Sequence, residues 1–254
     1  MLLIRYLCFL LVSLSLTACV NLVPKAAEEI ESAQTVKSPL DGIWQGTFDI
    51  NGSGNYDFTA LHIQGRSTAV SVKAKAMCRG RVELQEEQYY MARYELFALD
   101  GAPFDQATIT GTVDQQAIRS HFITMNGGDI GAINLDYNPL YERKPELAEL
   151  DGHWLFIDRD GLETKMSISN GQIVGVDSDG CGYQGTLAII NPQYNLFDVV
   201  LNVSSCDSVN GEYIGLAYFE PGKKPLVHID ALNNLYGFHY QLQRVSASEI
   251  TASR

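Results

Sequence analysis

The chain has 254 residues and a formal net charge of -12, with 30 acidic residues against 18 basic ones. A surface this acidic keeps a protein soluble and repels phosphate backbones, so we expect no nucleic-acid partner. The 13 tyrosines and 10 phenylalanines favour strands over helices.

The first 18 residues have the features of an export signal. One charged residue, Arg5, precedes an apolar run from Tyr6 to Leu16, which is too short to cross about 30 Å of hydrocarbon. The run ends in Leu16-Thr17-Ala18-Cys19. This tetrad resembles the lipobox of bacterial lipoproteins, which implies removal of residues 1–18 and a lipid on Cys19 that attaches the protein to a membrane. The alternative is an ordinary secreted protein with a cysteine near its cleavage site.

The residues after Cys19 bear on location and on flexibility. Lipoproteins of this type that stay at the inner membrane carry an Asp after the cysteine, whereas Val20 and Asn21 stand here. The resemblance therefore implies the outer membrane of the bacterial envelope. Residues 19–39 contain no aromatic residue and few large apolar ones, so we expect a flexible tether. We also expect residues 246–254 to be a disordered tail.

An internal repeat follows the tether. Leu40-Asp41-Gly42-Ile43-Trp44 recurs as Leu150-Asp151-Gly152-His153-Trp154, and these are the two tryptophans of the chain. Further matches pair Cys78 with Cys181, Tyr90–Leu96 with Tyr194–Val200, and the arginines Arg143 and Arg244. Four matches in the same order predict two homologous domains, residues 40–145 and 150–245.

The pattern within each copy is that of antiparallel strands. Residues 69–74 and 165–169 alternate apolar and polar side chains, and turn sequences such as Asn51-Gly52 and Asn170-Gly171 separate the apolar runs. We therefore predict an all-β chain with two tandem small antiparallel β-barrels of about eight strands each, closed so that no sheet edge stays free.

The motif Gly-x-Trp on the first strand, with an arginine near the end of the last, resembles the calycin pattern of lipocalins and avidin-like barrels. In that family the arginine packs across the tryptophan ring at one end of the barrel. The resemblance implies the pairs Trp44 with Arg143 and Trp154 with Arg244. Each copy is shorter than a typical lipocalin, and a generic barrel or sandwich with a structural tryptophan is the alternative.

The cysteines indicate an oxidising compartment. Residues 186–190 and 195–203 read as a hairpin that places Cys181 opposite Cys206, so we predict a disulfide between them. Cys78 then has no partner within its own copy. It is either a buried inert thiol or the site of an intermolecular bridge.

Chemical motifs are weak. The histidines have no zinc-site spacing, and the segments from Asp158 and Asp177 begin like calcium loops but lack the glutamate at position twelve, so hairpin turns explain them better. The sequence contains no nucleophile elbow and no phosphate-binding loop. We therefore predict no metal, no cofactor and no catalytic residues.

Two functions remain open. The first is a non-catalytic binding or assembly module that presents its barrels to an envelope protein partner. The alternative is a lipocalin-like carrier of a small hydrophobic ligand inside one barrel, with His153 beside Trp154 as a lining or surface candidate. Copies of about 100 residues leave little room for a large cavity, so we expect packed interiors.

Overall fold

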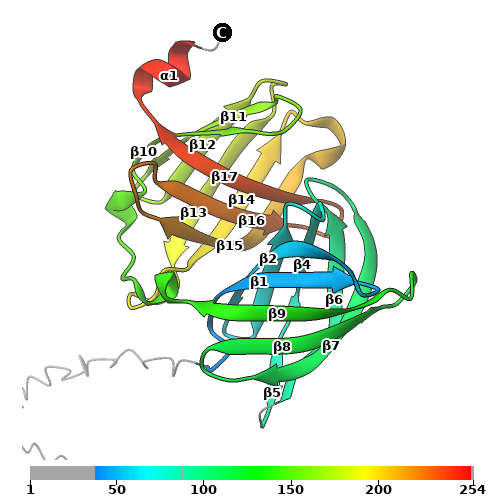
Figure 1. Ribbon diagram of the computed structural model, residues 1–254. Coiled ribbons are helices and arrows are strands. Elements are labelled where there is room, and N and C mark those ends of the chain that lie inside the picture. Colours follow the sequence, from blue (N-terminus) through cyan, green and yellow to red (C-terminus); the bar gives the residue numbers. More distant parts are fainter. Residues whose placement is uncertain (1–37, 87, 253–254) are drawn as a thin grey trace, which may run out of the picture. The chain divides into compact units, whose positions relative to one another are not determined.

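The structure, a computed structural model, describes residues 38–86 and 88–252. The predicted signal peptide, Cys19 and the predicted tether up to residue 37 lie outside these described residues. Within them the chain is almost entirely antiparallel strands, which confirms the all-β prediction. The strands form two closed barrels of eight strands each, one after the other in the chain (Figure 1).

The first barrel contains the strands drawn from blue to green in Figure 1. These are β1 (Gly42–Ile50), β2 (Ser53–Ile63), β3 (Arg66–Ser71), β4 (Ala76–Arg81), β5 (Glu83–Gln85), β6 (Gln88–Ala98), β7 (Pro103–Val113), β8 (Ala117–Thr124) and β9 (Ile130–Asn138). Pairing of β4 with β6 and of β1 with β9 closes the ring, and the short β5 follows β4 along the same edge of β6.

The second barrel follows two short 3-10 helices, Pro139–Glu142 and Leu147–Glu149. Its strands are β10 (Gly152–Ile157), β11 (Glu163–Ser169), β12 (Gln172–Asp177), β13 (Gly182–Ile189), β14 (Phe197–Ser204), β15 (Gly211–Glu220), β16 (Leu226–Leu232) and β17 (Gly237–Val245). Each strand pairs with the next along the chain, and β10 with β17 closes the barrel. Both rings are thus up-and-down barrels, in which closure satisfies the strand edges.

The predicted turns form the hairpin corners. Asn51-Gly52 and Asn170-Gly171 each connect two strands by two residues with positive φ, the geometry of a type I′ turn. The predicted strand over residues 69–74 ends early, at Ser71, because the carboxylate of Asp57 accepts hydrogen bonds from the backbone N–H groups of Val72 and Lys73 and holds them in a turn.

The repeat is real, but its predicted register is wrong after the third strand. Successive cross-strand partners, starting at the tryptophan, are Trp44, Ala60, Ala69 and Cys78 in the first barrel and Trp154, Met166, Gly175 and Tyr183 in the second. Cys78 therefore corresponds to Tyr183 and not to Cys181. The β3–β4 and β12–β13 turns differ in length, so a short sequence match cannot preserve the register that strand pairing sets.

The predicted disordered tail contains a short helix, α1 (Ala247–Ala252). The side chain of Glu249 accepts hydrogen bonds from both the backbone N–H and the hydroxyl of Ser246, at 2.7 Å each. A serine before the first turn with a glutamate three residues later is a capping box, which satisfies donors that a helix start leaves open. The prediction overlooked this local signal.

Candidate binding sites

The repeated Leu-Asp-Gly-x-Trp motif is structural in both barrels. The indole N–H of Trp44 donates to the carbonyl of Leu40 at 2.9 Å, and Trp154 makes the same bond to Leu150 at 2.8 Å. The aspartates also match, because Asp41 accepts the N–H of Gln64 and Asp151 that of Asn170. Gln64 and Asn170 both open a type I′ turn with positive φ. The motif thus closes one end of each barrel and caps its second hairpin.

The two predicted tryptophan–arginine pairs have different outcomes. In the second barrel, Arg244 lies on β17 directly opposite Trp154, with its guanidinium carbon 4.7 Å from the ring centroid. In the first barrel, the predicted pair with Arg143 is wrong. Arg143 follows the last strand and lies over the ring of Phe219 in the second barrel, at 5.2 Å. The residue opposite Trp44 is Tyr137, which packs edge-on against the indole.

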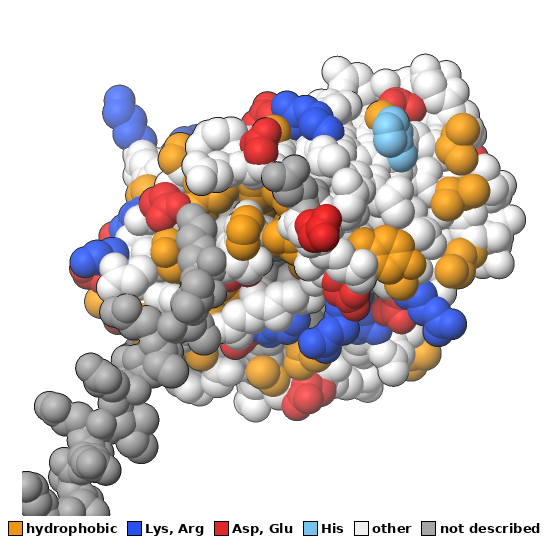
Figure 2. Space-filling view, turned by 90° about the horizontal axis from the view of Figure 1, so that it is seen from below, with side chains coloured by type: hydrophobic (Ala, Val, Ile, Leu, Met, Phe, Trp, Pro, Cys, Tyr) orange, Lys and Arg blue, Asp and Glu red, His pale blue; other side chains and the backbone are white. Residues whose placement is uncertain are grey.

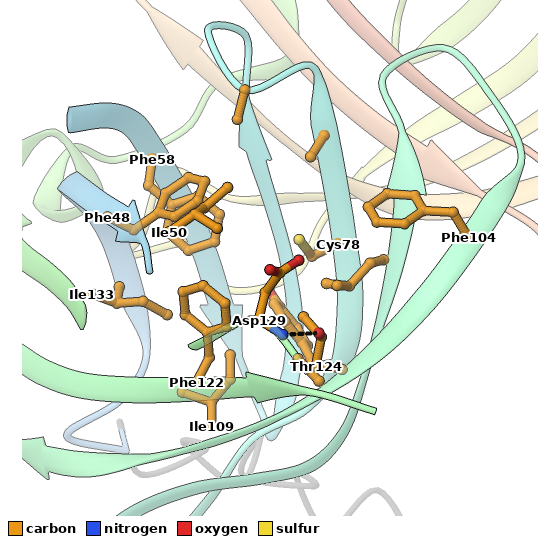
Figure 3. A pocket seen from close by; sticks show the side chains of 15 residues that line it. Phe48, Ile50, Phe58, Cys78, Phe104, Ile109, Phe122, Thr124, Asp129 and Ile133 are labelled. Carbon is orange, nitrogen blue, oxygen red and sulfur yellow. Dashed lines mark hydrogen bonds between the residues drawn. The ribbon is translucent and has the colours of Figure 1, made fainter. Parts of the chain in front are cut away.

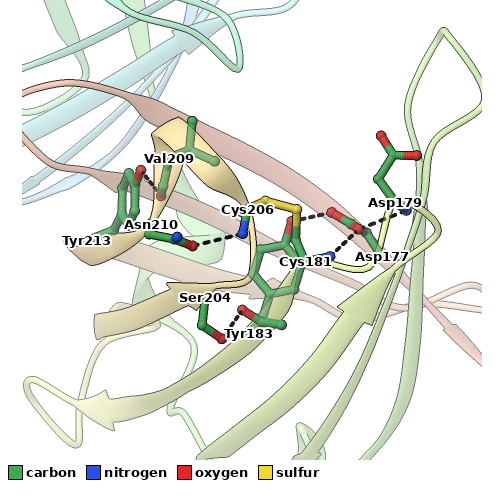
Figure 4. The surroundings of a disulfide bond; sticks show 10 residues. Asp177, Asp179, Cys181, Tyr183, Ser204, Cys206, Val209, Asn210 and Tyr213 are labelled. Atoms are coloured by element: carbon green, nitrogen blue, oxygen red, sulfur yellow. Dashed lines mark hydrogen bonds between the residues drawn. A yellow bond between two sulfur atoms is a disulfide. The ribbon is translucent and has the colours of Figure 1, made fainter.

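The predicted disulfide is present, between Cys181 and Cys206 at the open end of the β13–β14 hairpin (Figure 4). The carboxylate of Asp177 lies beside it and accepts hydrogen bonds from the N–H groups of Asp179 and Cys181 and from the hydroxyl of Tyr183. Asp177 and the two cysteines are close enough together to hold a metal ion. Because the sulfurs are bonded to each other, they are not thiolate ligands, and Asp177 acts as the cap of its turn.

Cys78 is buried inside the first barrel. Burial, together with the charge of Asp230, raises the pKa of its thiol to about 12. A thiol that stays protonated and is shielded from solvent is a poor nucleophile and cannot reach a second molecule. The structure thus supports the buried inert thiol over the intermolecular bridge.

The first barrel contains a partly open, mainly apolar cavity of about 150 Å³. Figure 3 shows Phe48, Phe58 and Phe122 grouped along its wall, with Cys78 also on its lining. Near the cavity, Phe104 has 59% of its surface exposed. An apolar space of this size accepts a ligand of about the size of benzene, whereas drug-sized ligands occupy roughly 300–1,000 Å³. The expectation of a fully packed interior is therefore wrong for this barrel.

The second barrel is filled by aromatic side chains. Tyr183, Tyr213, Phe238 and Tyr240 are buried and contact one another at centroid distances of 4.8–6.4 Å. Three of these aromatics, Tyr183, Phe238 and Tyr240, line a hollow of about 560 Å³ together with charged residues such as Asp158 and Arg159 and with Val72, Leu99 and Asp100 of the first barrel. Asp158 accepts the N–H groups of Asp160 and Leu162, so its segment is a turn.

The barrels meet in a junction that sequence reasoning missed. Thr68 of the first barrel donates to Asp230 of the second at 3.3 Å, and the N–H of His239 donates to Asp100 at 2.9 Å. A stacked pair, Tyr141 and Tyr194, and an apolar cluster around Leu216 and Tyr218 add to the contact. No local sequence pattern marks these residues, because each contact joins positions more than 50 residues apart.

The side chain of His153 lies on the wall of the second barrel, where Nδ1 is 2.9 Å from the hydroxyl of Ser167, its cross-strand partner. A serine and a histidine at this distance resemble a nucleophile and its base, but a triad needs a third group that orients the histidine. In the part of the chain that the structure describes, no carboxylate is hydrogen-bonded to this ring. The contact is an ordinary polar cross-strand pair.

Comparison of the chain with protein-family models, with curated proteins and with solved structures gives no match. Among the described residues, no helix has both the length and the apolar character needed to cross a bilayer.

On the face drawn in Figure 2, acidic and basic side chains lie side by side, and hydrophobic ones are scattered between them. The candidate sites therefore depend on geometry alone: the cavity of the first barrel and a groove where the barrels meet.

Proposed function

We propose that this protein is a lipid-anchored binding module of the bacterial envelope, held at the outer membrane through Cys19, which presents its two barrels to a protein partner. The lipobox-like tetrad Leu16-Thr17-Ala18-Cys19 supports the anchor. No catalytic motif occurs in the sequence, which favours binding over catalysis.

One observation carries the proposal: residues of both barrels form a single groove of about 790 Å³. The groove is spanned by an ion pair in which Arg66 of β3 lies 2.6 Å from Asp198 of β14. The buried contacts of the junction hold its two walls together. A surface that exists only when both domains are docked is a preorganised binding site, which reduces the entropy lost on association.

The anchor is tested by replacing Cys19 with serine and following the protein through membrane fractionation. We expect the wild type to incorporate a radiolabelled fatty acid and to sediment with outer membranes, and Cys19→Ser to do neither. A Cys19→Ser protein that stays in the membrane fraction would contradict the anchor and leave the binding proposal standing.

The binding surface is tested by photo-crosslinking in intact cells. Ile214 lines the groove with 60% of its surface exposed, and Val174 is a matched control at 59%, on β12 outside the groove lining. With a photoreactive phenylalanine analogue at one position or the other, we expect a specific protein adduct from position 214 and not from 174. Adducts from neither position, or equally from both, would count against the groove.

The cavity of the first barrel favours a second function, the carriage of a small apolar ligand. Its volume of about 150 Å³ suits a ligand with few carbon atoms better than a whole lipid. Native mass spectrometry of protein purified from its own host tests this function. A copurifying small molecule would support it, and a mass equal to that of the chain with its lipid would contradict it.

A further inference from the structure

We infer that the groove between the barrels binds a segment of the partner protein that carries several carboxylates and an apolar side chain. This inference rests on the proposed binding function, because it names the chemistry that the groove would recognise. The lining contains four arginines, Arg66, Arg79, Arg81 and Arg93, within a chain whose net charge is -12.

Strand pairing places these arginines next to one another. Arg66 on β3 is the direct cross-strand partner of Arg81 on β4. Arg79 on β4 pairs with Glu95 on β6, and two residues further along these strands stand Arg81 and Arg93. Like charges at neighbouring positions of a sheet repel each other and lower stability. An anionic ligand that lies across them would relieve this repulsion.

Carboxylates of the chain neutralise only some of the four. Arg66 is paired with Asp198, and Arg79 with Glu95, both at 2.6 Å. The lining contains one further carboxylate, Glu83, beside the exposed Arg81 and Arg93. With four arginines and three carboxylates on its lining, the groove keeps one net positive charge, whereas the chain as a whole is acidic. An acidic partner is repelled elsewhere and attracted here, which fixes where it docks.

The second barrel contributes apolar side chains to the opposite wall of the groove, next to Asp198. Ile214 on β15 is largely exposed, and Val200 on β14 is its direct cross-strand partner. Both side chains line the groove, as do the arginines of the first barrel. A ligand that fits has charged groups on one side and an apolar side chain on the other.

The spacing of the arginines favours a peptide over a single phosphate or lipid headgroup. Neighbouring strands lie about 4.8 Å apart, so Arg66 and Arg93, on strands on either side of β4, are separated by about 10 Å at the backbone. A peptide in the polyproline II conformation has three residues per turn and rises about 3.1 Å per residue, which places carboxylates three residues apart on one face, about 9 Å from each other. Arginine binds carboxylates with two parallel hydrogen bonds, which adds geometric specificity.

The test uses the detergent-solubilised full chain and a fluorescein-labelled peptide of sequence Glu-Leu-Ala-Glu-Leu-Ala-Glu, with a peptide that has Gln for each Glu as its control. Fluorescence anisotropy should show binding of the acidic peptide, weaker at higher salt, and at least tenfold weaker binding by the double variant Arg81→Glu, Arg93→Glu. The control is Arg119→Glu, the same type of substitution at one exposed arginine outside the groove lining. Its affinity should stay within twofold of the wild type, and thermal unfolding confirms that all variants fold.

Four results would overturn the inference. The acidic peptide does not bind, the Gln peptide binds equally well, or Arg119→Glu loses as much affinity for the acidic peptide as the double variant does. The fourth is that phosphatidylglycerol vesicles bind in place of the peptide and the double variant loses this binding. Sedimentation of the chain alone identifies a fifth, a self-associated form that the double variant abolishes, which would make a second copy the occupant. The proposed function fails separately, because crosslinking at position 214 reports a partner of any chemistry.

Discussion

The carboxylate of Asp230 lies 2.7 Å from Nδ1 of His239, and both side chains are buried on neighbouring strands of the second barrel where it meets the first. Thr68 and Asp100 of the first barrel complete this network. A buried charged pair is stable only when further hydrogen bonds satisfy it, so the network depends on the docking of the two barrels. The junction therefore links the protonation of one histidine to the arrangement of both domains.

The Asp230–His239 pair predicts a loss of stability at alkaline pH. Burial alone lowers the pKa of His239, but the hydrogen bond and charge of Asp230, with the charges of Asp100 and Asp57, raise it more, so the net pKa lies above the ordinary 6.5. A histidine whose pKa is raised by folding contributes its full stability below pH 6.5 and loses it as the pH rises through the folded pKa. In urea unfolding between pH 6 and 9, the free energy of unfolding should decline less for His239→Gln than for the wild type. If the free energy of unfolding of His239→Gln declined as much as that of the wild type, the pH dependence could not be due to His239. His121→Gln, at an exposed histidine, is the control.

The buried His62 predicts a loss of folding stability at acid pH. Burial lowers its pKa from 6.5 to about 4, so folding excludes its charged form. The stability that depends on the neutral ring is present above pH 6.5 and is lost as the pH falls towards 4, in total about 3 kcal/mol at roughly 1.4 kcal/mol per pKa unit. An NMR titration of the full chain checks this directly. The ring of His62 should stay neutral at pH 5, and a midpoint near 6.5 would refute the prediction.

The aspartates of the repeated motif should contribute similar stability in the two barrels. Asp41→Ala and Asp151→Ala each remove a charged acceptor from a backbone N–H of a tight turn, which should lower the free energy of unfolding by about 1.5–2 kcal/mol. Asp136→Ala is the matched control, since its ion pair with Arg119 is on the surface and should contribute less than about 1 kcal/mol. If all three substitutions lowered the free energy of unfolding equally, the motif aspartates would contribute no more stability than an aspartate in a surface ion pair.

The disulfide should stabilise the second barrel. Cys181 and Cys206 are 25 residues apart, and in the loop-entropy model the bond contributes about 3 kcal/mol. The double variant Cys181→Ser, Cys206→Ser should unfold at correspondingly lower urea concentration, and dithiothreitol should shift the wild type to the same midpoint without affecting the variant. Cys78→Ser is the control for loss of a thiol. A reductant that leaves the wild-type midpoint unchanged would refute the contribution of the bond.

The sequence by itself determined the fold class, the duplication, the principal turns and the disulfide. Each of these depends on local chemistry or on period-two patterns: Asn170-Gly171 favours positive φ, and the hairpin between Cys181 and Cys206 brings its own ends together. The resemblance to the calycin motif also implied the pair of Trp154 and Arg244, which are direct cross-strand partners in the second barrel.

The tertiary structure alone decided the rest. The register of Cys78, the position of Arg143 over Phe219 and the cavity of the first barrel depend on how strand pairing and side-chain volumes combine in three dimensions. The groove depends on the docking of two domains whose contacts join residues more than 100 positions apart, such as Arg66 and Asp198. No pattern along the chain encodes such contacts, because they arise from shape and charge complementarity between finished barrels.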